Sequence, residues 1–224
     1  MSPGLPTRTR VIILAKAPQP GLSKTRLAPA LGLEGAARLA DRFLRETVAM
    51  ATHSGVGPVE LCAAPDLEHP VWLELQQRHG CALSVQGPGD LGSRMARAMQ
   101  HALGMQPAAL LIGTDAPALD APMLQAAALA LQQNDAVFVP TADGGYALIG
   151  LRRFDPRLFD GIAWSTSAVM QATRQALSVA GMSHAELPMI HDVDEPADLV
   201  HVPAAWLEAA GSEGAPWTLS PNVP

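Results

Sequence analysis

An unbroken apolar run, AALLI (108–112), passes directly into the polar turn GTDAP (113–117). Five apolar residues in succession are typical of a strand buried on both faces, as in a parallel sheet covered by helices. A second run of this kind, VIILA (11–15), opens the chain. Ligands of open α/β sheets sit beyond the carboxyl ends of the strands. The polar residues that follow these two runs are therefore the first candidates for a functional site.

Short apolar runs alternate with helical patterns along the whole chain. Strands are predicted over 11–15, 59–63, 82–85, 108–112, 136–139, 146–149 and 187–190, and helices over 34–53, 71–79, 91–103, 123–133, 167–180 and 196–209. This alternation predicts βαβ units and a single-domain, three-layer α/β/α fold with a mostly parallel sheet. The run at 146–149 follows 136–139 across a short turn, so it can pair antiparallel. We expect the domain over 8–210 and a loose, Gly-, Ser- and Pro-rich tail over 211–224.

Composition narrows the class of protein. The chain has 224 residues, of which 48% are hydrophobic and 16% charged, and its net charge is -6. This size and composition predict one sizeable core and exclude a disordered chain. The acidic balance argues against nucleic acid as a partner. No apolar run reaches the roughly 20 residues of a membrane span, and the first run is too short for a secretory signal, so we expect a cytoplasmic protein. Cys62 and Cys81 lack the spacing of a zinc site and are expected as buried thiols.

The first candidate site follows the first predicted strand. Lys16, Lys24 and Arg26 form the densest basic cluster after any strand, around a Gly-Pro loop. On an acidic protein, such a cluster suits a di- or triphosphate. The alternative is an ordinary solvated turn. The loop matches neither a Walker loop nor the GxGxxG pattern.

Two acidic segments are candidates for a divalent cation. Asp115 follows the buried strand at 108–112, where it could hold Mg²⁺ or Mn²⁺ or simply cap the turn before a proline. In the segment HDVDEPAD (191–198), Asp192 and Asp194 alternate, so in an extended chain both carboxylates point the same way. The competing interpretation of Asp194 is the cap of the helix that follows. Either carboxylate remains a candidate for the second metal ligand.

A glycine turn and two weaker segments complete the candidates. In DGGY (143–146), Asp143 precedes Gly144 and Gly145, which allow close approach of a ligand to the backbone but also form ordinary hairpin turns. Tyr146, the only tyrosine, suits either stacking on a ligand or core packing. The weaker segments contain Arg94, which could face a nucleotide, and Trp164-Ser165-Thr166, which could simply begin a helix.

Six ordered motifs together resemble one family. They are AKAP (15–18) with KTRL (24–27), GDLGSRM (89–95), GTDAP (113–117), DGGY (143–146), WSTS (164–167) and DVDEPADL (192–199). In this order they resemble the bacterial glycosyltransferase-A-like proteins associated with arsenosugar biosynthesis, relatives of the 2-phospholactate guanylyltransferases. The resemblance runs from residue 11 to about residue 206.

The resemblance implies a nucleotide-diphospho-sugar transferase fold of the glycosyltransferase-A type. It places the nucleotide over the first strands, with its phosphates facing Lys16, Lys24 and Arg26. The residues assigned to nucleotide or phosphate binding are Ala15, Lys16, Lys24, Arg26, Arg94 and Thr114. By the same analogy, Asp115 takes the place of the metal-binding aspartate and Asp192 or Asp194 lies near the second metal position, while residues 143–146 face the donor sugar or the acceptor.

The leading functional hypothesis is a glycosyltransferase that takes a nucleotide-diphospho-sugar donor with Mg²⁺ or Mn²⁺, Lys24 and Asp115 being catalytic. The partners are then a nucleotide or nucleotide sugar and a small-molecule acceptor. The alternative is a nucleotidyltransferase that joins a nucleoside triphosphate to a phosphorylated small molecule and releases pyrophosphate. A third hypothesis is a binding protein that keeps the nucleotide pocket without turnover.

Overall fold

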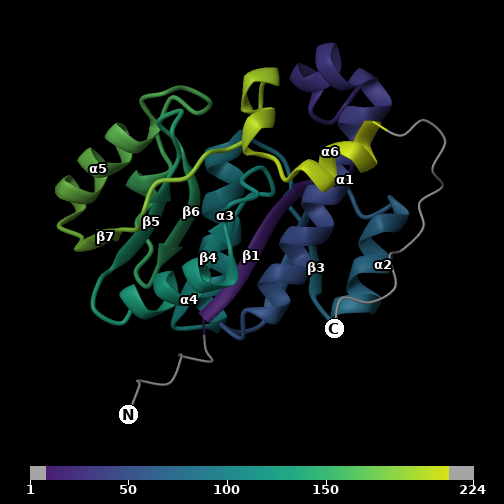
Figure 1. Cartoon of the computed structure of the whole chain (residues 1–224). Coiled ribbons are helices and arrows are strands. Elements are labelled where there is room, and N and C mark those ends of the chain that lie inside the picture. The colour runs from purple at the N-terminus through teal and green to yellow at the C-terminus, as the bar shows by residue number, and fades with distance from the viewer. Residues whose placement is uncertain (1–8, 212–224) are drawn as a thin grey trace.

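The computed structural model describes residues 9–211, and its strands form one sheet (Figure 1). The strands are β1 (Thr9–Lys16), β2 (Val59–Ala64), β3 (Ala82–Val85), β4 (Ala108–Ile112), β5 (Ala136–Pro140), β6 (Tyr146–Leu151) and β7 (His184–Glu186). The sheet has seven strands in the order β3-β2-β1-β4-β6-β5-β7. Every pair of neighbours is parallel except those that include β6, which runs antiparallel to β4 and β5. The predicted α/β fold with a mostly parallel sheet is confirmed.

Helices cover both faces of this sheet. They are α1 (Ala28–His53), α2 (Pro70–His79), α3 (Leu91–Met105), α4 (Ala121–Ala130), α5 (Val169–Ala180) and α6 (Ala204–Gly211), together with the 3₁₀ helices η1 (Thr25–Leu27), η2 (Pro156–Leu158) and η3 (Pro196–His201). Helices α1, α2 and α4 cover one face of the sheet and α3 and α5 cover the other, while α6 lies against α1 (Figure 1). The result is a three-layer α/β/α arrangement.

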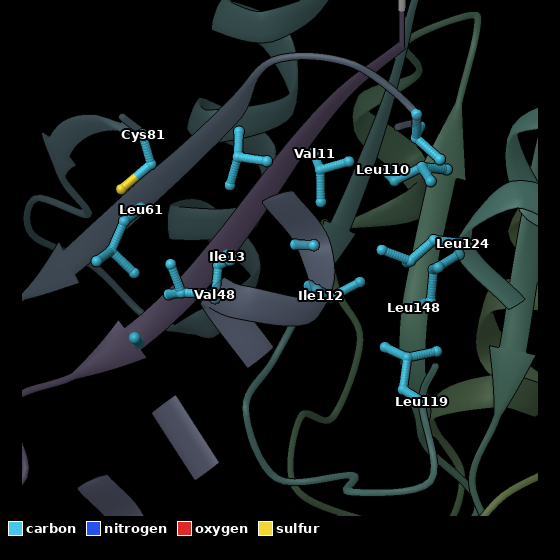
Figure 2. Close-up of a cluster of buried hydrophobic side chains, with 14 of the residues drawn as sticks. Val11, Ile13, Val48, Leu61, Cys81, Leu110, Ile112, Leu119, Leu124 and Leu148 are labelled. Carbon is cyan, nitrogen blue, oxygen red and sulfur yellow. The ribbon is translucent and has the colours of Figure 1, made fainter. Parts of the chain in front are cut away.

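The core explains why the strands are apolar without alternation. In β1, Val11 and Ile13 face the α1 side of the sheet, whereas Ile12 faces the α3 side. Figure 2 shows the first of these clusters, in which Val11 and Ile13 lie with apolar residues of the neighbouring strands and helices. Cys62 and Cys81 are buried free thiols, as expected, and belong to the clusters on opposite faces.

Two predicted elements near the end of the chain are wrong. The expected strand at 187–190 is absent. The last strand in the described part of the chain, β7, lies just before these residues, and of the four only Ile190 forms an isolated bridge, to Thr141. Pro188 has no backbone N–H to donate to a ladder. The expected helix at 196–209 is divided into η3 and α6, because Pro203 forces the preceding Val202 into an extended conformation (φ -90°, ψ 133°).

The start of α1 also differs from the prediction. α1 consists of a short helical turn from Ala28 and a long helix, separated by a kink at Gly32, which is non-helical with a φ of 70°. The long helix after the kink agrees with the predicted helix at 34–53, and the turn before it was not predicted. The predicted domain boundaries at 8 and 210 stay predictions, since residues 1–8 and 212–224 lie outside the described part of the chain. No helix within residues 9–211 combines the length and the apolar character that crossing a bilayer requires.

Candidate active site

The carboxyl ends of β1 and β4 open into a cavity of about 700 Å³. β1 lies between β2 and β4, so the chain leaves it in one direction and returns on its other side. Such a switch point is where open α/β sheets bind ligands. Because β6 is antiparallel to β4, its first residues reach the same edge. The cavity is lined by Ala15, Lys16, Lys24, Arg26, Arg94, Thr114, Asp115, Asp143, Gly145, Tyr146, Asp192 and Asp194, among others.

Of the candidate residues, Gly144 alone is not among those that line the cavity. It has a φ of 92°, and a Cβ there would lie 2.2 Å from the carbonyl oxygen of Ser167. Only glycine therefore permits this close approach between the 143–146 turn and the segment before α5. Gly144 therefore contributes to the site by letting this turn, which carries the lining residues Asp143 and Gly145, approach Ser167.

The loop after β1 is folded so that Lys24 points inward. The hydroxyl of Ser23 donates to the carbonyl oxygen of Ala17 (2.8 Å) and accepts from the backbone N–H of Gln19 (3.1 Å). Lys24 itself has a left-handed backbone (φ 48°, ψ 41°), which is uncommon for a residue with a side chain. Its side chain is only 8% exposed as a result.

The buried ammonium of Lys24 joins three segments of the chain. Nζ lies 2.7 Å from Oδ1 of Asp115 and 2.8 Å from Oδ1 of Asp194, and it donates to the carbonyl oxygen of Val193 at 2.7 Å. Burial opposes the charge, but the two carboxylates outweigh it and raise the pKa of Lys24. An ammonium has three N–H donors, so each is matched by a protein oxygen. Lys24 therefore organises the two acidic side chains directly.

Three further cations line the cavity without a carboxylate partner. Lys16 and Arg26 are exposed, and Arg94 is anchored by a hydrogen bond from its Nε to the carbonyl oxygen of Gly89 (2.9 Å). Within residues 9–211, none of the three makes an ion pair with an acidic side chain. They are thus the cations available to the phosphates of a ligand.

The acidic residues near the end of the chain have separate positions. Oδ2 of Asp198 accepts from the backbone N–H groups of Asp194 (3.0 Å) and Glu195 (2.8 Å). The cap of η3 is therefore Glu195, with Asp198 reaching back from the third helical position, and not Asp194, whose side chain binds Lys24. Asp192 lies near Asp143 of the turn at 143–146. Burial, together with the charge of Asp143, raises the pKa of Asp192.

The donor set fits a divalent cation that arrives with a phosphate. Asp115 and Asp194 each give one oxygen to Lys24, and their side chains remain 50% and 44% exposed. Mg²⁺ commonly takes one or two protein carboxylates and fills its other positions with phosphate oxygens and water. Among residues 9–211, no three or more His, Cys, Asp or Glu side chains are grouped so that they would hold a metal by themselves.

The sequence analysis missed Gln86. This side chain is 5% exposed, lines the cavity, and donates through Nε2 to the carbonyl oxygens of Ala15 (3.0 Å) and Cys62 (3.1 Å). It therefore ties the ends of β1, β2 and β3 together beneath the site. Its position directly after a strand was the available signal, but an isolated glutamine carries little chemical meaning without its contacts.

The fold and a relative of known structure together define the class: the chain is a transferase with the nucleotide-diphospho-sugar transferase fold. A crystal structure of a candidate nucleotide-diphospho-sugar transferase from Desulfovibrio desulfuricans G20 superposes with a TM-score of 0.79 and 30% identity over 87% of this chain and 86% of that one. The chain belongs to the family described as "Uncharacterized protein conserved in bacteria (DUF2064)", which matches residues 47–166.

More distant structures share the fold alone. The 4-diphosphocytidyl-2C-methyl-D-erythritol synthase of Anaerococcus prevotii has a TM-score of 0.59 at 10% identity, over 87% of this chain and 94% of its own. The inositol-1-phosphate CTP transferase of T. maritima has a TM-score of 0.57 at 11% identity, over 95% and 100%. Among curated proteins, no sequence matches the chain.

Proposed function

We propose that the chain is a glycosyltransferase that takes a nucleotide-diphospho-sugar donor. The observation that carries this proposal is the meeting, in one cavity, of a basic loop from β1 and the Lys24-linked carboxylates Asp115 and Asp194. The name of the Desulfovibrio desulfuricans relative, at 30% identity, supports the donor class.

The nucleoside would occupy a second cavity beside the main one. A second cavity of about 560 Å³ is lined by Gln19, Pro65 and Pro88 and shares Lys16 and Arg94 with the larger one. A nucleotide whose base and ribose occupy the smaller cavity would present its diphosphate to the shared cations. The group to be transferred would then lie in the larger cavity.

Catalysis in this arrangement is mainly stabilisation of charge. As the bond between sugar and diphosphate breaks, negative charge grows on the leaving group, and fixed cations stabilise it more in a cleft than in water. Lys16, Arg26 and Arg94 are placed for this task. Asp115 and Asp194 would hold Mg²⁺ or Mn²⁺, which supplies further charge neutralisation when bound. Lys24 keeps the two carboxylates together.

Nucleotidyl transfer is the second candidate. The three unpaired cations could equally serve the larger charge of a nucleoside triphosphate, from which a phosphorylated acceptor would displace pyrophosphate. The two reactions differ in the bond that breaks. The link to arsenosugar biosynthesis and the cytoplasmic location stay predictions from the sequence.

Thermal unfolding with a panel of nucleotides and nucleotide sugars, with and without Mg²⁺ or Mn²⁺, tests the proposal. At a hundredfold excess over Kd a ligand stabilises by about 2.7 kcal/mol, or roughly 5–10 °C for a chain of this size. Product analysis then separates the candidates: nucleoside diphosphate indicates glycosyl transfer and pyrophosphate indicates nucleotidyl transfer. If no nucleotide raises Tm, both are wrong.

A further inference from the structure

Tyr146 and Trp164 form an aromatic corner in the wall of the larger cavity. Their rings are perpendicular (90°), with centroids 6.4 Å apart, and both residues line the cavity. Tyr146 begins β6, whereas Trp164 comes from the segment between η2 and α5. The two segments are joined where the backbone N–H of Met170 donates to the carbonyl oxygen of Gly144 at 2.8 Å. Two motifs distant in the sequence therefore build one wall.

The hydroxyl of Tyr146 has no hydrogen-bond partner within the described part of the chain, although its oxygen is buried. The ring is held by Phe138, 5.5 Å away, as well as by Trp164. An unsatisfied buried hydroxyl costs about 1–3 kcal/mol, and phenylalanine would fill the same space without that cost. A ligand oxygen that accepts from this hydroxyl would remove the penalty. Because the oxygen is closed off from solvent, the side chains around it have to shift for such contact.

The surroundings of the corner favour an uncharged ligand. Asp143 lies three residues before Tyr146, and Asp192 lines the same cavity. Carboxylates accept hydrogen bonds from hydroxyl groups and repel another anion. In the proposed function, the cations of the cavity are taken up by the diphosphate. An aromatic surface adds an apolar face against which the C–H side of a ring can pack.

We propose that this aromatic corner binds the ring of an uncharged sugar and discriminates against a sugar that carries a carboxylate. Tyr146 donates to a ring or hydroxyl oxygen, Trp164 packs on the C–H face, and the two aspartates accept from hydroxyl groups. This inference rests on the proposed function and names the chemistry of the group held beside the diphosphate. The sugar is either attached to the nucleotide or part of a separate acceptor.

Isothermal titration with UDP, UDP-glucose and UDP-glucuronate, or the same series of another base that the thermal panel selects, tests the inference. Free glucose in the presence of UDP forms the fourth arm. For a donor sugar, we expect UDP-glucose to bind about tenfold or more tightly than UDP, and for an acceptor, we expect free glucose to raise the affinity for UDP by a similar factor, equivalent to 1.4 kcal/mol. UDP-glucuronate should bind no more tightly than UDP. The linked arm identifies a donor sugar, and the free arm an acceptor.

Three variants locate the effect. Tyr146→Phe and Trp164→Leu should lose the gain from glucose while UDP affinity stays within about twofold of the wild type. Tyr146→Phe should not lower Tm, because it removes an unsatisfied hydroxyl. The control Trp206→Leu changes a tryptophan that packs on Phe43 in another cluster, and it should keep the gain.

The outcomes separate this inference from the function beneath it. If UDP or its counterpart binds but glucose adds nothing in either arm, or if the gain survives in both Tyr146→Phe and Trp164→Leu, the sugar corner is wrong and the nucleotide site stands. Equal gains from glucose and glucuronate overturn the charge discrimination. If no nucleotide binds to the wild type, the proposed function and this inference fail together.

Discussion

Lys24 concentrates the electrostatics of the site in one side chain. Lys24→Met keeps an unbranched side chain of similar length and removes the cation between Asp115 and Asp194. Breaking a fully buried ion pair costs about 3–5 kcal/mol, but both carboxylates are about half exposed and can be solvated. We therefore expect a loss of about 1–2 kcal/mol in the free energy of unfolding, measured with urea. Arg174→Met, which removes an exposed pair with Glu186, should cost less than about 1 kcal/mol.

The contribution of Lys24 should depend on pH in the alkaline range. Burial opposes its charge, yet the two carboxylates raise its pKa in the folded protein above the value of about 10.4 expected for the unfolded chain. A group with a raised folded pKa stabilises fully below its unfolded pKa and loses this effect as pH rises through the folded pKa. The difference in unfolding free energy between wild type and Lys24→Met should be constant from about pH 6 to 9 and shrink above about pH 10.4. A difference that grows there would contradict the pairing.

Asp115 separates chemistry from stability. Asp115→Asn preserves volume, and Lys24 keeps Asp194 and the carbonyl oxygen of Val193 as partners. We expect kcat to fall by about 10²–10³, the usual effect of removing one electrostatic stabiliser, while Tm changes by less than about 3 °C. Steady-state kinetics and thermal unfolding check both numbers. Wild-type turnover in this variant would remove Asp115 from the mechanism.

At the scale of elements, the first turn of α3 is fitted against Trp164. A Cβ on Gly92 would lie 2.3 Å from Nε1 of Trp164 and 2.6 Å from the carbonyl oxygen of Phe159. Gly92→Ala should therefore destabilise by about 1–3 kcal/mol through overpacking. Gly104, in the same helix, has open space at its Cβ, so Gly104→Ala should stabilise by about 0.5–1 kcal/mol. Urea unfolding of the two variants gives opposite signs if α3 is placed correctly.

The buried strands and the edge strand β3 could be predicted from the sequence, but the other edge strand, β7, could not. β4 is apolar throughout because helices cover both of its faces, so its pattern is visible locally. β7, at the edge of the sheet, has the sequence HAE and exposed ends. It carries no apolar signal, so the strand was predicted over the more apolar residues after it, 187–190.

The candidate site could be predicted in membership but not in pairing. The strand-end rule selected Lys24 and Asp115 because each follows a buried strand. It could not reveal that the lysine contacts the aspartate, since this contact depends on the left-handed backbone of Lys24 and on the return of Val193 to the end of β4, where its N–H donates to the carbonyl oxygen of Asp115. Long-range pairing of this kind leaves no local pattern.

At the scale of the whole molecule, a third apolar cluster connects the site segments from the beginning of the chain with those from its end. Leu27 beside the basic loop, Phe43 of α1, and Val193 and Val202 of the last segment are buried together, apart from the two clusters on the sheet. The basic loop and residues 190–198 are thus coupled twice, through this cluster and through Lys24. A ligand that orders one of these segments should also order the other.

Hydrogen exchange followed by mass spectrometry tests this coupling. When a nucleotide from the thermal panel binds, amides of 21–27 and of 190–198 should gain protection together, since local opening of both segments is suppressed by the same contacts. The region 59–79, which includes β2 and α2, should change little. In Val193→Ala, which removes a fully buried contact from the shared cluster, the ligand should still protect 21–27 but protect 190–198 less. Protection confined to 21–27 in the wild type would show that the two segments respond independently.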